Sequence, residues 1–314
     1  ALRKAAPDAR ITMLVDEKLK DVVLFNPYLD EVVTIDKKGR DNSILSLWAC
    51  SRHLSKLDFD VLINLHPNER CSFIDAMTSV KLRTGTTHKI FKWFWDVFTP
   101  LDRSMHAADM YLDVLQQLGV QDLSNNGLEI FPGEEHFLEA ELFWQEQNIT
   151  DQDKLIGFNI GSAVPTKRWP PERFADVADI FAAKGYKTVF FGGPMDEEMV
   201  AKATGYMQTR PIIATGHFAI GGLAAAMRRC CLIITNDSGP MHVAISQKVP
   251  IVAMYGPSNP KLYGPYTKDA VIVTAQPPCQ GCADGMKHSC DDLQCMSRMT
   301  VEQVVAAADT MLNK

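Results

Sequence analysis

The second half of the chain alternates short, nearly continuous apolar runs with longer amphipathic segments, and this alternation constrains the fold more than any other feature. Runs without polar alternation are typical of parallel strands that are buried on both faces. The runs are residues 155–160, 188–193, 211–215, 232–235 and 250–255, and the helices predicted after the first four are residues 172–184, 196–207, 220–229 and 241–247. We therefore predict βαβ units and a parallel sheet.

The first half repeats this alternation with weaker signals. Its predicted strands are residues 11–16, 31–36 and 61–65, and its predicted helices are residues 18–25, 43–57 and 105–118. A chain of 314 residues accommodates two domains of ordinary size. We predict an α/β protein with one doubly wound domain in residues 1–150 and a second, with a C-terminal helix, in residues 151–314. The chain opens like the last turns of an amphipathic helix, so a strand and a loop are expected upstream of Ala1.

Composition narrows the functional classes. The net charge of −6 argues against a nucleic-acid-binding protein, which usually carries a basic excess. No apolar run approaches the ~20 residues of a membrane-spanning helix. The eight cysteines are too few in a chain of this length for a disulfide-dense secreted domain. Four of them are interpreted as buried thiols, which favours the reducing cytoplasm: Cys50, Cys71, Cys230 and Cys231.

Three predicted strands of the second half end in residues that could bind a ligand. Open parallel sheets bind ligands at the carboxyl ends of their strands. The first such end is GSAVPTKRW (161–169), in which small residues let backbone N–H groups approach an anion and Lys167 can neutralise it. Taken alone, this segment is better explained as a proline-containing turn with a solvated basic pair.

The second strand end is TNDSGPMH (235–242). Proline near the start of the predicted helix, together with the free N–H groups of its first turn, favours an anion site. Asp237 is a candidate helix cap, and Ser238 and His242 could face the ligand. The alternative is simple helix capping with a core histidine. A serine nucleophile is disfavoured, because Asn236 and Pro240 replace the glycines of a nucleophile elbow.

The third strand end, FFGGPMDEEM (190–199), carries carboxylates. Asp196, Glu197 and Glu198 favour a helix N-terminus but would repel phosphate, so a ligand here should offer hydroxyls such as those of ribose. Capping alone explains these acids equally well. Two of these strand ends are suited to anions, and the third is suited to hydroxyl groups. Together they indicate that the ligand is a sugar nucleotide with a diphosphate.

These motifs, in this order, resemble the ADP-heptose:lipopolysaccharide heptosyltransferases of glycosyltransferase family 9. The resemblance extends over essentially the whole chain, and its most specific part is NDSGPMHVA followed by YGPSNP. It implies a GT-B fold of two Rossmann-like domains facing across a cleft, the first for the acceptor and the second for the donor. It also implies an inverting, metal-independent transfer of heptose from ADP-heptose to an inner-core sugar, with no cofactor.

Site residues are carried over motif by motif. Ser162 and Lys167 would hold the diphosphate, and the backbone near Phe218 would lie against adenine. Glu197 would contact the ribose, with Asp196 as the alternative. The remaining donor-site residues would line the phosphate and heptose side: Asp237, Ser238, Gly239 and His242. The family's catalytic base is an Asp in a Gly-Asp loop, which is expected upstream of Ala1.

The acceptor is expected against the first domain. LHPNERCS (65–72) places His66, Asn68 and Arg70 after a predicted strand, and Arg70 could pair with an acidic sugar or a phosphate of the lipopolysaccharide core precursor. A solvated loop is the alternative. RTGTTHKIFKWFWDVF (83–98) interleaves basic and aromatic residues, which suits peripheral docking on the inner face of the inner membrane; the alternative is that half of these aromatic residues are core.

The last cysteines lie in PPCQGCADGMKHSCDDLQCM (277–296). These cysteines could form a structural zinc site, remain thiols or form two disulfides: Cys279, Cys282, Cys290 and Cys295.

Two other functions of the chain remain open. The chain could bind a nucleotide sugar without transferring it, or it could be another GT-B enzyme such as a sugar-nucleotide epimerase.

Overall fold

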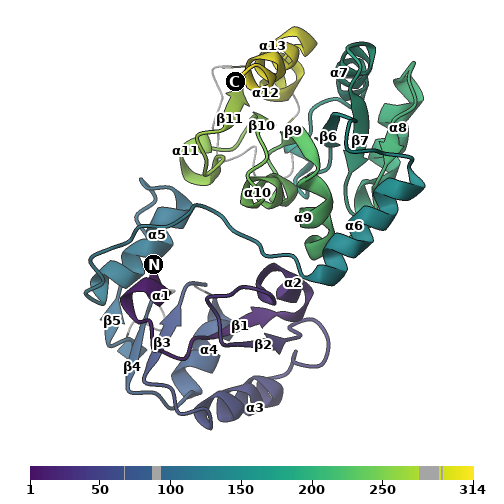
Figure 1. The fold of residues 1–314 in the computed structure, drawn as a ribbon. Coiled ribbons are helices and arrows are strands. Elements are labelled where there is room, and N and C mark those ends of the chain that lie inside the picture. The colour runs from purple at the N-terminus through teal and green to yellow at the C-terminus, as the bar shows by residue number, and fades with distance from the viewer. Residues whose placement is uncertain (67, 87–92, 276–289, 291–292) are drawn as a thin grey trace. The chain divides into compact units, whose positions relative to one another are not determined.

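The computed structural model describes residues 1–66, 68–86, 93–275, 290 and 293–314. The chain divides into two compact units, Ala1–Asn126 and Gly127–Lys314 (Figure 1). The predicted domain boundary at residue 150 lies beyond helix α6 (Glu134–Glu146), which packs against α9 (Ile220–Met227) of the second unit. The observed division is earlier because the apolar side chains Ala140, Phe143 and Trp144 of α6 are buried in the core of the second unit.

The first unit contains two parallel β-ladders. One joins β1 (Thr12–Asp16) to β2 (Glu31–Ile35), and the other joins β3 (Val61–Asn64), β4 (Leu82–Gly85) and β5 (Val97–Phe98). The helices are α1 (Leu2–Ala5), α2 (Lys20–Val23), α3 (Ile44–Ser55), α4 (Glu69–Met77) and α5 (Ala107–Gln117). The predicted strands and the parallel pairing are confirmed, whereas the sequence analysis did not predict β4 and β5, which are short.

The second unit is built on one six-stranded parallel sheet with the order β11-β10-β9-β6-β7-β8. Its strands are β6 (Leu155–Asn159), β7 (Lys187–Phe191), β8 (Ile212–Ile213), β9 (Cys230–Asn236), β10 (Ile251–Met254) and β11 (Ala270–Val273). The strand order reverses direction at β6, as in doubly wound sheets. The five apolar runs form β6 to β10, and only β11 was not predicted.

Helices cover both faces of this sheet (Figure 1). Ile156, Phe158 and Ile234 pack with α7 (Pro171–Ala183) and α13 (Val301–Leu312) on one face. Leu155 and Ile233 point to the other face, where α6, α9 and α10 (Gly239–Ser246) pack. The remaining helices are α8 (Glu197–Tyr206), α11 (Pro260–Tyr263) and α12 (Gln294–Ser297). Burial on both faces explains why these strands are uninterrupted apolar runs.

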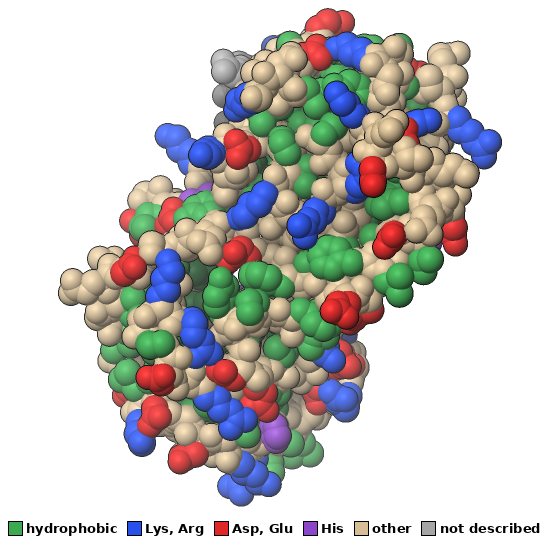
Figure 2. Space-filling model, viewed as in Figure 1, with side chains coloured by type: hydrophobic (Ala, Val, Ile, Leu, Met, Phe, Trp, Pro, Cys, Tyr) green, Lys and Arg blue, Asp and Glu red, His purple; other side chains and the backbone are tan. Residues whose placement is uncertain are grey.

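Local signals set several helix ends. Thr300 and Gln303 form a capping box at the start of α13, and Ser43 and Ser46 form another at the start of α3. On the face shown in Figure 2, basic, acidic and apolar side chains are interspersed. Among the described residues, no helix combines the length and the apolar character that crossing a bilayer requires.

Candidate donor site

The predicted donor residues gather at the carboxyl edge of the six-stranded sheet. Because the strands are parallel, the loops after β6, β7 and β9 emerge at the same edge. Hydrogen bonds join these loops directly. Asn236, the last residue of β9, donates from Nδ2 to the carbonyl of Ile160 (2.8 Å) and accepts the backbone N–H of Trp169 at Oδ1 (3.0 Å). The loop that carries Lys167 is therefore fastened to the end of β9.

A buried ion pair joins two of the predicted residues. Lys167 ends a short 3-10 helix, and its Nζ donates to Asp237 Oδ2 at 2.7 Å, with 12% and 6% of the two side chains exposed. The Ser258 hydroxyl donates to the same carboxylate oxygen. An ammonium group has three N–H donors, so one bond to Asp237 leaves donors for an anionic ligand. The pair also offsets the charge of Asp237, which would otherwise repel phosphate.

The suggested helix cap at Asp237 is wrong. Ser238 is the N-cap residue of α10, and the Asp237 carboxylate turns instead to Lys167 and Ser258. The Ser238 hydroxyl makes no capping bond to the helix either. The first N–H groups of α10, beginning at the exposed Gly239, thus receive no side-chain cap. His242 lies one turn further along and is half-buried.

Ser162 lies in the turn that follows β6. Its side chain is largely buried, its Oγ accepts the N–H of Val164 (3.3 Å), and it approaches the carbonyl of Asp237 at 3.5 Å. The carbonyl of Ser162 accepts Nε of Arg168 (2.9 Å), so Arg168 braces the turn. Ser162 and Asp237 therefore lie in adjoining loops, as the diphosphate prediction requires.

The acidic loop after β7 packs against the turn that follows β6. The Asp196 carboxylate accepts the N–H of Gly193 (2.9 Å) and lies so close to Gly161 that a Cβ there would overlap it. Only glycine fits at position 161 without moving Asp196. Glu197 begins α8 and is exposed, as expected of a group that meets a ligand hydroxyl.

The loop that carries Phe218 lies next to Glu197. A Cβ at Gly216 would be 3.0 Å from Glu197 Oε1, and Gly216 has a positive φ of 75°. Phe218 packs edge-on against Phe143 with ring centroids 5.1 Å apart. The predicted ribose-contacting acid and the predicted adenine-contacting loop are thus neighbours.

Three residues of this edge were missed by the sequence analysis: Asn159, Asn236 and Ser258. Asn159 donates from Nδ2 to Thr235 Oγ1 (3.0 Å) and to Ser238 Oγ (2.8 Å). Each of the three is a polar residue that is almost fully buried at or just after the end of an apolar strand. A polar residue at the end of a buried strand is the signal that could have identified Asn159 and Asn236.

The YGPSNP segment (255–260) directly follows β10 and contacts the donor residues. Tyr255 is buried and donates from its hydroxyl to the carbonyl of Tyr263 (2.8 Å). Burial, together with the nearby Asp237 carboxylate, raises the pKa of the Tyr255 hydroxyl. Tyr255 therefore stays protonated, and the segment presents Ser258 to Asp237.

The predicted acceptor residues lie after β3 in the first unit and make local contacts. Asn68 caps α4 by accepting the N–H of Cys71 (2.8 Å). Arg70 donates to the carbonyl of Lys37 (2.6 Å) and to Asn42 Oδ1 (2.7 Å). His66 is exposed. The structure brings the three together, but the contacts of Asn68 and Arg70 are those of a helix cap and a loop brace.

A buried carboxylate lies beneath this loop. Asp75 of α4 accepts Nδ2 of Asn64, whose Oδ1 accepts the N–H of His66 (2.6 Å). Burial raises the pKa of Asp75 to about 7, opposed by the Asn64 hydrogen bond and by Arg83. The sequence analysis missed Asp75, because an Asp within a helix gives no sign of its burial.

Two other predictions fall partly outside the described residues. Lys89 and Lys92 lie outside them, whereas Trp93 is 75% exposed and stacks on Phe94. Cys279 and Cys282 also lie outside, while Cys290 is exposed and Cys295 is buried. The described residues include no group of three His, Cys, Asp or Glu side chains that could hold a metal ion. Membrane docking and structural zinc stay predictions.

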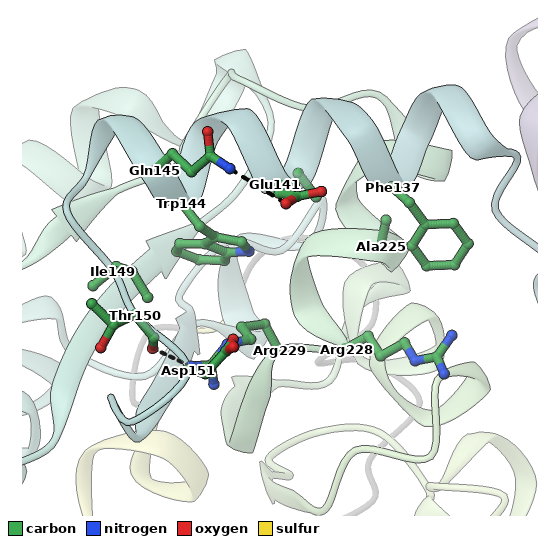
Figure 3. Close-up of a pocket in the computed structure, with 11 residues that line it drawn as sticks. Phe137, Glu141, Trp144, Gln145, Ile149, Thr150, Asp151, Ala225, Arg228 and Arg229 are labelled. Carbon is green, nitrogen blue, oxygen red and sulfur yellow. Dashed lines mark hydrogen bonds between the residues drawn. The ribbon is translucent and has the colours of Figure 1, made fainter.

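A separate pocket of about 700 Å³ lies between α6, α9 and the loop before β6 (Figure 3). Trp144 and Phe137 line it on the apolar side, and Arg229 reaches the carbonyl of Thr150 at 2.5 Å. The pocket lies beside the start of β6, whereas the donor residues follow the other end of that strand. It contains none of the predicted site residues.

Comparison with known proteins places the chain among glycosyltransferases. A family model described as glycosyltransferase family 9 (heptosyltransferase) matches residues 47–290. Lipooligosaccharide heptosyltransferase 2 of Haemophilus ducreyi is 33% identical over 138 residues, which are 42% of this chain and 40% of that relative. The match thus spans less than half of that curated relative.

Solved structures show the same fold. A crystal structure of a family 9 glycosyl transferase from Veillonella parvula is 52% identical, with a TM-score of 0.94 over 99% of this chain and 91% of that one. Heptosyltransferase WaaC of E. coli with ADP has a TM-score of 0.71 at 16% identity, over 98% of this chain and 92% of that one. The GT-B type α/β fold is confirmed.

Proposed function

Because the chain belongs to glycosyltransferase family 9, we propose that it is an inverting transferase that moves heptose from ADP-heptose to an inner-core sugar of lipopolysaccharide. The observation that carries the proposal is the convergence of Ser162, Lys167 and the start of α10 at one sheet edge. A lysine, a small-residue turn and uncapped helix N–H groups together suit a diphosphate. WaaC, a structural neighbour, is a heptosyltransferase solved with ADP and with a fluorinated ADP-heptose analogue.

In the proposed mechanism, the acceptor hydroxyl loses its proton to a base while it attacks the anomeric carbon from the face opposite ADP. We expect this base to be the Asp of a Gly-Asp loop, as the family resemblance implies. The leaving diphosphate gains charge in the transition state, and Lys167 and the start of α10 stabilise that charge. Asp237 keeps Lys167 extended toward the site, and Glu197 contacts the ribose.

We propose that the acceptor binds to the first unit. His66, Asn68 and Arg70 would face a lipid-linked core precursor, and Trp93, which is 75% exposed, would help to hold the protein at the inner face of the inner membrane. These assignments imply a cytoplasmic, peripheral enzyme that needs no cofactor.

The central experiment measures ADP release from ADP-heptose with and without a core-lipid acceptor. Release that requires the acceptor is the expected result. Release without the acceptor would contradict transfer and favour another GT-B reaction. Binding of the donor with no release in either condition would favour a nucleotide-sugar-binding protein without transferase activity.

Lys167→Ala tests whether the positive charge of Lys167 stabilises the leaving diphosphate. We expect turnover at saturating donor to fall about a hundredfold, with a smaller loss of ADP affinity, because the charge on the diphosphate grows in the transition state. Lys184→Ala is the matched control, since Lys184 pairs with Asp309 on the surface. Lys167→Arg, which preserves the charge beside Asp237, checks that a loss reflects charge rather than misfolding. Unchanged turnover in Lys167→Ala would remove Lys167 from the mechanism.

A further inference from the structure

We propose that Asn159 is a positioning residue that makes Ser238 a hydrogen-bond donor toward the diphosphate of the nucleotide. The inference deepens the proposed function and rests on it. It assigns Asn159 a role at the donor site that goes beyond packing the end of β6. The role follows from counting the donors and acceptors around the Ser238 hydroxyl.

The Asn159 amide nitrogen contacts two hydroxyl groups. It lies 3.0 Å from Thr235 Oγ1 and 2.8 Å from Ser238 Oγ. Both hydroxyls also reach one acceptor, the carbonyl of Asn236, at 2.8 Å from Thr235 and 3.3 Å from Ser238. A carbonyl can only accept, so both hydroxyl protons point to Asn236. The amide must therefore present its N–H groups to the two hydroxyl oxygens.

This arrangement determines how Ser238 can meet a ligand. A lone pair of its oxygen is occupied by the Asn159 N–H, and its single proton faces the Asn236 carbonyl. At 3.3 Å that second bond is longer than the 2.5–3.0 Å typical of O–H···O bonds. A phosphate oxygen at the start of α10 can take the proton while Asn159 holds the oxygen in place. Ser238 then donates to the anion without moving.

Two further observations separate a positioning role from ordinary packing. Ser238 is the N-cap residue of α10, yet its hydroxyl makes no capping bond, although capping is the usual role of serine there. The Asn159 Oδ1 atom is buried and has no hydrogen-bond partner, which is an unfavourable arrangement for a residue that serves stability alone. The amide is thus used for its donors, and these are directed at Ser238 and Thr235.

The test measures ADP affinity of the full chain by calorimetry. Asn159→Leu removes the donors at similar volume, and Ser238→Ala removes the hydroxyl. We expect each to weaken ADP binding about tenfold to a hundredfold, and the double variant to bind like either single one. Thr235→Val is the control, because Thr235 is fully buried and should leave ADP affinity within about twofold. Asn159→Asp should weaken binding further, since a carboxylate would claim the Ser238 proton and repel phosphate.

Adenosine binding distinguishes positioning from misfolding. Adenosine lacks the diphosphate, so Asn159→Leu and the unmodified chain should bind it equally, whereas a distorted site would lose adenosine as well. Losses of ADP affinity that multiply in the double variant, unchanged ADP affinity in Asn159→Leu, or a parallel loss of adenosine would each overturn the role of Asn159 and leave the proposed function standing. If the unmodified chain does not bind ADP, the proposed function fails and the inference fails with it.

Discussion

The two units of this protein differ in what they bury. The second unit contains two extensive apolar clusters, one on each face of its sheet, and Phe158, Phe181 and Phe190 in the first of them are fully buried. The main described cluster of the first unit has four buried members, Ile35, Leu47, Leu54 and Ile74. The strand ends of the second unit are therefore supported by a much larger apolar core.

Buried polar atoms show the same contrast. In the described part of the first unit, five side chains bury a polar atom that has no hydrogen-bond partner: Ser72, Thr84, Thr86, Trp95 and Thr99. In the second unit the only such atom among the described residues is Asn159 Oδ1, at the proposed donor site. Unpaired buried groups reduce stability. We infer that the second unit is the more stable of the two and that the first unit opens more readily.

Truncation of one core residue in each unit should give the largest effects. Phe181→Ala should cost about 4 kcal/mol of unfolding free energy, and Ile74→Ala about 2–3 kcal/mol, because a small core can collapse around the cavity. Hydrogen exchange resolved by peptide would assign each loss to its unit. Leu138→Ala, at a position that is 57% exposed, is the neutral control. Equal costs at Phe181 and Ile74 would argue against the difference between the cores.

A smaller and pH-dependent effect is expected at Asp75. Its pKa is about 7 when folded, against 3.8 as the ordinary value, so the folded state retains a proton that the unfolded state releases. The free energy of unfolding of the first unit should therefore fall as the pH rises from about 4 to about 7, and stay level above. Asp75→Asn should remove this slope and stabilise the first unit at pH 8 by on the order of 2–4 kcal/mol.

The measurement for Asp75 is denaturant unfolding of both proteins at several pH values, followed by a probe in the first unit. Asp60→Asn provides the control, because Asp60 is 74% exposed and pairs with Lys81 on the surface. A first unit whose stability keeps the same slope after Asp75→Asn would show that another group is responsible.

The smallest effects should come from the matched capping boxes. Ser43→Ala in α3 and Thr300→Ala in α13 each remove a side-chain bond to the N3 backbone, and each should cost about 1 kcal/mol. Hydrogen exchange near α3 should respond only to the first substitution, and exchange near α13 only to the second. A response of both units to either substitution would contradict independent opening.

Sequence analysis predicted the second unit better than the first for a physical reason. Strands buried on both faces must be apolar throughout, so β6, β7, β9 and β10 were visible as runs. Strand β4 includes Arg83, Thr84 and Gly85, so it is not an apolar run, and β5 has only two residues. That the helix α6 belongs to the second unit depends on its contact with α9, which the sequence alone does not reveal.

The sequence by itself determined the parallel α/β class, the succession of strands and helices in the second unit, and the motif residues that identify the family. Only the tertiary structure decided how those residues are used. It paired Asp237 with Lys167 rather than with the helix, and it placed Asn159 against Ser238. Periodicity and turn chemistry act between near neighbours along the chain, whereas these contacts join loops more than 60 residues apart that meet only because the strands of the sheet are parallel.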